Sequence, residues 1–261
     1  MKLLILCLLW SGQVLAWGSI GHRVVAQLAE ERLSPNAKAR LRVILGRDTL
    51  ADIANWPDAI RSDSRWVMAD PWHYVTIEDG QSYNPTTANT KGDVIQAIER
   101  FKRELIDAKS TALQKREAVA FLVHFVADVH QPLHVGRGAD RGGNSIELKW
   151  FRASSNLHQI WDEKLIEMER LSYREYARFI DKASEEQKVA WGRVGLLGWA
   201  EESKALRTQV YNFPSTRARN WEYNYRYQMM PIVHERLQQA GVRLAALLNE
   251  SLRPLPKKVD K

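Results

Sequence analysis

Cysteine is almost absent from this chain. Cys7 is the one cysteine among 261 residues, and it lies in an N-terminal segment with the features of an export signal. Without that segment the protein can form neither a disulfide nor a thiolate metal site, so any metal site must use His, Asp, Glu and backbone groups. Secreted eukaryotic proteins of this size more often carry disulfides, so the absence favours a bacterial periplasm or culture medium.

Long apolar runs are also missing. The apolar stretch from Leu3 to Trp10 is too short to span a bilayer, and we expect no membrane span. It follows Lys2 and precedes small residues at Val14 and Ala16, as in a signal peptide. We therefore predict that residues 1–16 are removed and that Trp17 becomes the N-terminus of a periplasmic or secreted protein. The alternative is an N-terminal core strand or helix.

No Pro/Gly/Ser-rich linker and no internal repeat divides the rest of the chain. We predict one domain over residues 17–251, and we expect a monomer. Residues 252–261 contain two prolines, with four charges after Pro254, and are predicted to be a disordered tail.

Negative charge is in the minority. The chain has 38 Lys and Arg against 31 Asp and Glu, a formal charge of +7, and loss of Lys2 with the signal leaves +6. Such a balance favours a polyanionic partner, although solvated surface cations alone would produce the same number.

Helical periodicity dominates the chain, and start signals such as Ser34-Pro35 and Ser172 precede some of the segments. The predicted helices are 22–33, 36–45, 93–108, 114–130, 158–168, 173–182, 185–199 and 216–248, the last in two or more pieces. Strand-like alternation is confined to 144–151, after the turn-rich stretch 136–143. The predicted fold is all-α, with one short β-hairpin and long loops.

Two histidine–aspartate pairs stand out within the helical segments. His124 and Asp128 are four residues apart, as are His158 and Asp162, and on a helix this spacing places both side chains on one face. The alternative for each is a surface ion pair. Both pairs lie among apolar residues, where an unpaired charge is costly, which favours metal ligation. Imidazoles combined with carboxylates suit zinc at sites that also bind water.

Other candidates stand alone in the sequence. His22, Asp58, His73 and His134 would each, taken singly, more often be a satisfied core or surface residue. Helical periodicity does not choose between His130 and His134, because on an ideal helix His130 points away from His124 and His134 lies only about 40° further round. Pro132 is expected to end or bend the helix, which could turn His134 toward a neighbouring site.

Taken in order, these positions resemble the zinc-dependent nuclease family typified by the fungal single-strand-specific nucleases S1 and P1, an all-α family related to phospholipase C. The motifs that carry the resemblance are Trp17-Gly18, Gly21-His22, Trp56-Pro57-Asp58-Ala59-Ile60-Arg61, Trp72-His73-Tyr74, His124-x3-Asp128-x5-His134, Gly142-Gly143-Asn144 and His158-x3-Asp162.

The resemblance implies three zinc ions. The first would be bound by Asp58, His73, His124 and Asp128, the second by the amino group and carbonyl of Trp17 with His22 and Asp128, and the third by His134, His158 and Asp162. Asp128 would bridge the first two, and His130 would not be a ligand. A free α-amine titrates near pH 8 and can bind zinc only after cleavage, so export would activate the enzyme.

The implied reaction is hydrolysis of single-stranded DNA and RNA to 5′-phosphorylated nucleotides, with 3′-nucleotidase activity. Zinc lowers the pKa of water to about 7, which supplies the nucleophile. Arg61 would contact phosphoryl oxygens, and Asp63 would orient Arg61 or a water. Tyr74 is the candidate for base stacking and Asn144 for hydrogen bonds to a base. Asp140 would oppose a phosphate path, and Arg137, Arg141, Lys149 and Arg152 would offset it.

Alternatives of three kinds remain at this point. A zinc phospholipase C would share the mechanism, and phospholipid is kept as a minor substrate. A periplasmic zinc-binding protein without catalysis would need closed coordination spheres, whereas catalytic sites leave positions for water. A purely structural helical protein would use none of these residues for chemistry.

Overall fold

The computed structural model describes residues 17–253 apart from 87, 214, 215 and 217. The predicted signal peptide, 1–16, lies outside the described residues, as does the predicted tail from residue 254 onward. Leu252, which the prediction assigned to the tail, is buried, so the packed chain extends at least to that residue. No helix of the described part combines the length and apolar character needed to cross a membrane.

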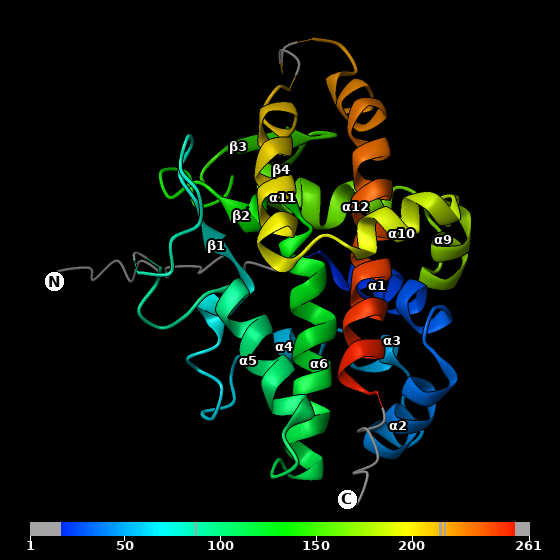
Figure 1. Ribbon diagram of the computed structural model, residues 1–261. Helices are drawn as coiled ribbons and strands as arrows, with labels where there is room; N and C mark the ends of the chain where they lie inside the picture. Colours follow the sequence, from blue (N-terminus) through cyan, green and yellow to red (C-terminus); the bar gives the residue numbers. More distant parts are fainter. Residues whose placement is uncertain (1–16, 87, 214–215, 217, 254–261) are drawn as a thin grey trace, which may run out of the picture.

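The described chain is mostly helical, as predicted (Figure 1). Its α-helices are α1 (Ser19–Glu31), α2 (Pro35–Leu45), α3 (Leu50–Ile53), α4 (Trp56–Ala59), α5 (Val94–Ile106), α6 (Ala112–Val129), α7 (Leu157–Gln159), α8 (Leu165–Glu167), α9 (Tyr173–Ile180), α10 (Glu185–Gly192), α11 (Leu196–Val210) and α12 (Trp221–Ser251). The 3-10 helices are η1 (Asp70–His73) and η2 (Pro132–His134), and η3 (Ile160–Lys164) is a π-helix. The strands are β1 (Val75–Thr76), β2 (Val135–Gly136), β3 (Glu147–Trp150) and β4 (Ala153–Asn156).

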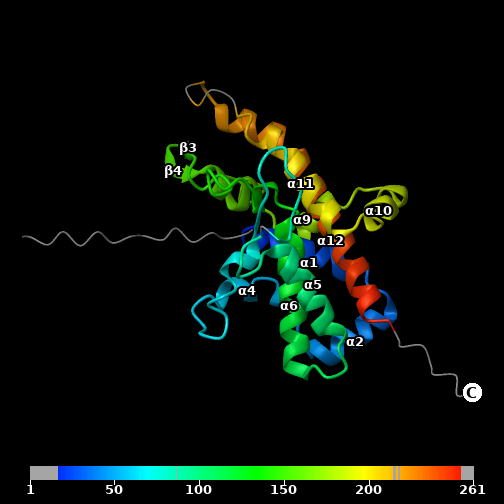
Figure 2. The ribbon, with the colours of Figure 1, turned by 60° about the vertical axis from the view of Figure 1, so that its left-hand side comes forward.

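Helix α6 forms the centre of the core. A capping box between Thr111 and Gln114 satisfies its first backbone N–H groups. Every residue from Glu117 to Val129 is buried, because α6 packs against α5 on one side and α1 and α12 on others. Figures 1 and 2 show α5 and α6 side by side, with the C-terminal half of α12 (red) to the right of α6. A buried helix of this kind holds its polar residues, His124 and Asp128, inside the protein.

Two helix predictions were wrong in their boundaries. The predicted helix 185–199 divides into α10 and α11, because Gly192 ends the first and Gly195, in an extended conformation, precedes the second. The segment predicted as two or more helices is the single helix α12, which continues through Pro231. Pro231 is exposed, so the carbonyl that loses its partner there faces solvent.

Strand structure is slightly more extensive than predicted. The predicted hairpin is confirmed as the antiparallel pair β3–β4, with Glu147 opposite Asn156. The parallel pair β1–β2 was missed, because two residues per strand are too few to show alternation. Arg207 of α11 ties the two strands together by donating to the carbonyl oxygens of Ile77 and Val135, at 2.7 and 2.9 Å. These strands follow His73 and His134, so their pairing brings two candidate ligands together.

Candidate metal centre

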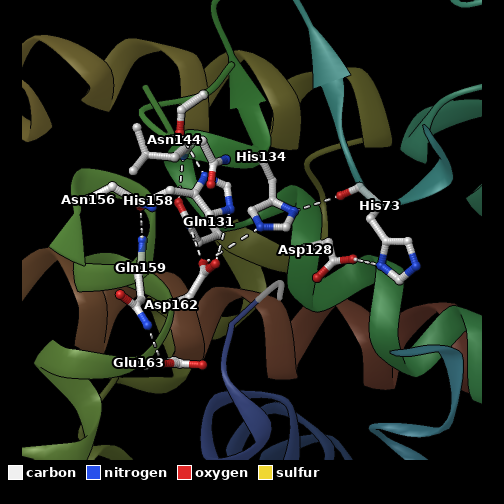
Figure 3. A network of polar contacts seen from close by, with 12 residues as sticks. His73, Asp128, Gln131, His134, Asn144, Asn156, His158, Gln159, Asp162 and Glu163 are labelled. Atoms are coloured by element: carbon white, nitrogen blue, oxygen red, sulfur yellow. Dashed lines mark hydrogen bonds and ion pairs between the residues drawn. The ribbon is translucent and has the colours of Figure 1, made fainter. Parts of the chain in front are cut away.

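The predicted ligand residues converge in space from distant segments. The histidines and aspartates among them form three groups, and within each group the ligand atoms lie within 4.8 Å of one another. The members come from α1, α4, η1, α6, η2, α7 and η3. The groups are His22, His124 and Asp128; Asp58, His73 and His124; and His134, His158 and Asp162. Figure 3 shows the polar network that joins the Asp128 and Asp162 ends of this region.

Asp128 lies at the centre of the first two groups and is fully buried. Its Oδ1 atom is 3.0 Å from His22 Nε2, and its Oδ2 atom is 3.1 Å from His73 Nδ1 and 3.4 Å from His124 Nε2. The two oxygens therefore face different imidazoles, as a bridging carboxylate requires. His124 belongs to both groups and stacks on His22 at 3.8 Å, so the division of ligands between two ions is less sharp than the family pattern implies.

Asp58 closes the second group from α4. Its carboxylate lies 3.7 Å from His124 Nε2 and 3.9 Å from His73 Nδ1, and it accepts a hydrogen bond of 2.8 Å from Arg61. Arg61 lies two residues beyond the end of α4, and the turn there returns its side chain to Asp58. The buried Nε of Arg61 has no hydrogen-bond partner among the described residues, so this guanidinium retains a donor beside the group.

The third group combines η2 with the irregular helix that runs from α7 into α8. Asp162 Oδ2 lies 3.0 Å from His158 Nε2, and Asp162 Oδ1 lies 3.7 Å from His134 Nε2. The π-helix η3 contains Asp162, and such insertions into helices are frequent at functional sites. All three side chains are buried.

Backbone carbonyls orient three of the histidines. Nδ1 of His124 donates to Ala54 O at 2.8 Å, Nδ1 of His134 to His73 O at 2.7 Å, and Nδ1 of His158 to Gly142 O at 2.7 Å. Each bond assigns the proton to Nδ1 and leaves Nε2 as a lone-pair donor toward the cluster, the arrangement that metal-binding histidines use.

Gly142 is required for the carbonyl that orients His158. Its φ of +61° lies in the left-handed region, and a Cβ there would stand 2.4 Å from the carbonyl oxygen of Leu133. A side chain at this position would clash with the backbone, so only glycine permits the loop to reach His158.

Several ligand nitrogens are buried without a hydrogen-bond partner. They include Nε2 of His134 and Nε2 of His158, although the latter lies 3.0 Å from Asp162 Oδ2. Buried polar atoms normally have hydrogen-bond partners. Nitrogen and oxygen atoms that instead lie close together without hydrogen-bond geometry are arranged as ligands of a shared ion are. The donor set of imidazoles and carboxylates therefore fits a metal ion.

The charge balance of the cluster also favours a cation. Burial alone would raise the pKa of Asp128, but His124, His22 and His73 hold that pKa well below its usual value. Burial lowers the pKa of His124 to about 3, which keeps its imidazole neutral and able to bind metal. Burial opposes protonation of His134, yet Asp162 and Asp128 raise its pKa to about 9. The third group thus attracts positive charge, which a metal ion would supply.

His130 points away from all three groups. Its Nδ1 donates to Val126 O at 2.7 Å, and its Nε2 lies 2.8 Å from Arg243 Nη1 and accepts from it. Both ring nitrogens are occupied, so the structure agrees with the family pattern in separating His130 from the ligand positions. His134 reaches the cluster because Pro132 starts a new turn, η2, after α6 ends.

Trp17 is fully buried at the entry to α1. The N–H of Gly18 donates to the carbonyl oxygen of Asp162 at 2.6 Å, which joins the start of the described chain to the third group. Gly18 allows this approach, because a Cβ there would stand 3.0 Å from the Asp162 carbonyl oxygen, and Gly21 leaves room for the side chain of Trp17, whose Cβ would lie 2.9 Å from an added Cβ. Figure 3 shows the chain that leads into α1 (blue) entering below Asp128 and Asp162.

A pocket of about 200 Å³ opens beside His158. Tyr74, Arg137, Arg141 and Asn144 are among its lining residues, and Tyr74 is 38% exposed. The sequence-predicted stacking and hydrogen-bonding residues therefore share one pocket next to the third group. An aromatic face and two guanidinium groups are suited to a base and its phosphates.

Two acidic residues near the centre are engaged by neighbouring residues. Asp140 does not line the pocket: it accepts from Gly143 N at 2.9 Å and Tyr211 Oη at 3.1 Å, so it opposes a phosphate path less than its sequence position suggested. Arg65 engages both carboxylate oxygens of Asp63, and no hydrogen bond joins Asp63 to Arg61 among the described residues, so a role for Asp63 in orienting Arg61 or a water stays a prediction.

Sequence reasoning also missed Gln131. Its buried side chain donates to Asp162 Oδ1 at 2.6 Å. The available signal was an uncharged polar residue between two histidines in an apolar segment, where burial demands hydrogen bonds.

A helical core that gathers imidazoles and carboxylates from seven elements beside an open, basic pocket defines a protein of the metal-dependent hydrolase class. The family model described as S1/P1 Nuclease matches residues 17–253. Endonuclease 2 of Arabidopsis thaliana is 31% identical, over 89% of this chain and 89% of its own. Nuclease P1 of Penicillium citrinum is 29% identical, over 90% and 97%, and Nuclease S1 of Aspergillus oryzae is 29% identical, over 58% and 55%. The chain belongs to the S1/P1 nuclease family, and it is a hydrolase of the nuclease type.

Proposed function

We propose that the chain is an exported phosphodiesterase that uses three zinc ions to hydrolyse single-stranded DNA and RNA to 5′-phosphorylated nucleotides. We include 3′-nucleotidase activity in the proposal, because a terminal 3′-phosphate presents the same reacting group. The observation that carries it is the convergence of three ligand groups, the third of which reaches, through His158, a pocket that contains an exposed aromatic ring. Export to a bacterial periplasm or medium is part of the same proposal.

Zinc fits these residues better than a hard cation does. Five histidines and three aspartates provide the side-chain ligands, and imidazole nitrogen is a ligand that zinc favours while magnesium and calcium select oxygen. When bound, zinc supplies Lewis-acid chemistry that makes water nucleophilic near neutral pH and neutralises charge on the phosphate.

The protein's own groups position the reaction. Asp128 holds the first two groups at a fixed separation through its two oxygens, because His22 faces one oxygen and His73 the other. Arg61, held by Asp58, directs a guanidinium toward the phosphoryl oxygens, where negative charge gathers during attack. His134, His158 and Asp162 would hold a zinc ion next to the pocket, where it would neutralise negative charge on the leaving oxygen.

Selection for single strands follows from the pocket. Tyr74 is partly exposed in the pocket, and Asn144, whose Nδ2 donates to Arg141 O, offers its Oδ1 there. An unpaired base can stack on the ring and present its edge, whereas a duplex hides both. Arg137 and Arg141 provide charge for the backbone phosphates.

The amino terminus completes the second metal position in this proposal. Trp17 is buried against the region of the third group, and the family match begins at this residue. Removal of residues 1–16 would expose an α-amine there, and its deprotonated form can bind zinc. A protein with one extra alanine before Trp17 should bind less zinc and lose activity. Full zinc content and activity in that variant would contradict the role of the amine.

Phospholipid hydrolysis and zinc storage are the alternatives that the experiment must separate. The protein processed to Trp17 is incubated with single-stranded RNA, single-stranded DNA, duplex DNA and phospholipid vesicles, before and after chelation and zinc restoration. The expected result is zinc-restored release of 5′-mononucleotides from single strands, with slower release from the duplex. Release from phospholipid alone would make the enzyme a phospholipase, and bound zinc without any hydrolysis would make it a carrier.

A further inference from the structure

Gln131 lies where the elements of the metal centre meet. It follows His130, the C-cap of α6, and is fully buried. Its backbone N–H donates to Asp128 O at 2.9 Å, and its carbonyl accepts from His134 N at 3.0 Å. One residue therefore joins the helix that presents Asp128 to the turn that presents His134.

The side chain of Gln131 makes two further bonds. Its Oε1 accepts from Leu133 N at 2.5 Å, and its Nε2 donates to Asp162 Oδ1 at 2.6 Å. These partners fix the orientation of the amide, because a backbone N–H can only donate and a carboxylate can only accept. Figure 3 shows Gln131 between His134 and Asp162, with a dashed line to the carboxylate.

The two bonds act on two ligands of the same group. The bond to Leu133 caps η2 and so sets the direction of His134, whose Nε2 faces Asp162. The bond to Asp162 engages Oδ1 and leaves Oδ2 directed at His158. A carboxylate with one oxygen held by a neutral donor is limited to one free direction, which favours monodentate binding.

We propose that Gln131 is a positioning residue for the third metal site: its amide simultaneously caps the turn that carries His134 and holds the carboxylate of Asp162 in its ligating orientation. This inference rests on the proposed third metal position. Outer partners of this kind typically change metal affinity or activity by about 10- to 100-fold when they are lost.

Two substitutions separate the two bonds. Gln131→Met has a similar volume and removes both bonds. Gln131→Glu keeps an oxygen to accept from Leu133 but replaces the donor with a second carboxylate beside Asp162. Gln239→Met is the matched control, because Gln239 is also buried and its Oε1 accepts from Arg236 in the network that α12 forms with Glu202.

The primary measurement is zinc per chain over a series of buffered free-zinc concentrations, on proteins processed to Trp17. We expect Gln131→Met and Gln131→Glu to bind one of three zinc ions about 10- to 100-fold more weakly and to retain the other two. The melting temperature of each metal-free protein and the separate kcat and KM values are measured alongside. We expect kcat to be lower than in the wild type, to return to the wild-type value in excess zinc, and KM to change little.

The outcomes distinguish positioning from packing. If Gln131→Met lowers only the metal-free melting temperature, as Gln239→Met is expected to, the residue is structural and the proposal fails. Normal or tighter zinc binding by Gln131→Glu would also overturn it, because the donor would then be unnecessary. Failure of the proposed function is seen separately, since wild-type protein would then bind fewer than three zinc ions at saturation.

Discussion

Two buried polar clusters share the C-terminal end of α6, and they differ in how their polar atoms are satisfied. Around His130 every partner comes from the protein. Arg236 donates to His130 O and to Ser203, and both Arg236 and Arg243 bond to Glu202. Around Asp128 and Asp162 the imidazoles and carboxylates face one another, and several ring nitrogens have no hydrogen-bond partner among the described residues.

The charges of the two clusters differ in the same way. Two arginines and one glutamate surround His130, and although burial would raise the pKa of Glu202, Arg243 and Arg236 lower it. The other cluster combines three aspartates with imidazoles, and burial keeps at least one of these, His124, neutral. The first cluster therefore has a small net positive charge and needs no added cation, whereas the three carboxylates of the second require one. Buried histidines alone do not identify a metal site; unsatisfied nitrogens that face carboxylates do.

Substitutions of Asp128 and Glu202, one carboxylate from each cluster, should show the difference between the clusters most clearly. Asp128→Asn should lower kcat on the order of 10³-fold and release zinc from two groups, because a neutral amide cannot bridge two ions. Glu202→Gln should leave zinc content and kcat near wild type but lower the free energy of unfolding by about 3 kcal/mol, because it leaves two buried arginines less well paired. Zinc analysis, kinetics and urea unfolding check both variants. Retention of three zinc ions and normal turnover in Asp128→Asn would remove Asp128 from the site.

Removal of metal should destabilise the protein through one cluster only. A ligand present at 1,000 times its Kd stabilises a folded protein by about 4 kcal/mol per site. At roughly 2–4 °C for each kcal/mol in a domain of this size, chelation should lower the melting temperature by about 10 °C or more. The shift should persist in Glu202→Gln and fall to about a third in Asp128→Asn, where only the third group would still bind zinc, as thermal unfolding with and without chelator would show. Equal shifts in all three proteins would mean that zinc binds elsewhere.

The contrast also explains which parts of the site could be predicted from sequence. His124 with Asp128 and His158 with Asp162 were visible as pairs, because both members lie on one helical segment. His22, Asp58 and His73 come from α1, α4 and η1, and only packing against α6 brings them to Asp128. Local periodicity contains no information on that packing, so these residues were reached through the family motifs alone.

The choice between His130 and His134 shows the same limit more sharply. Both follow the last residue of α6, and helical periodicity does not separate them, because on an ideal helix they lie only about 40° apart. Arg243, 113 residues further along the chain, occupies the free nitrogen of His130, while η2 carries His134 to Asp162. The helical fold itself was predictable, because the buried faces and capping residues are local. The break between α10 and α11 and the two-residue strands were not.

The smallest expected effect concerns the proton on His130. Burial, together with Arg236 and Arg243, holds the pKa of His130 well below its usual value, so the folded protein keeps this ring neutral. In the unfolded chain the same histidine has an ordinary pKa near 6.5. Below that pH the unfolded chain binds a proton that the folded protein does not, so the free energy of unfolding decreases as the pH falls toward the folded-state pKa. For this one residue the loss between pH 7.5 and 5 should be about 2 kcal/mol.

His130→Gln isolates this loss, because an amide can donate to Val126 O and accept from Arg243 without titrating. The free energy of unfolding of both proteins is measured from pH 7.5 to 5 with metal removed, so that zinc release does not contribute. Wild type should be the more stable protein at pH 7.5, and its advantage should shrink by about 2 kcal/mol at pH 5. Parallel pH profiles would show that the folded network accepts a proton at His130. The arginine-rich cluster would then tolerate added charge, and the distinction drawn between the two ends of this helix would rest on the metal groups alone.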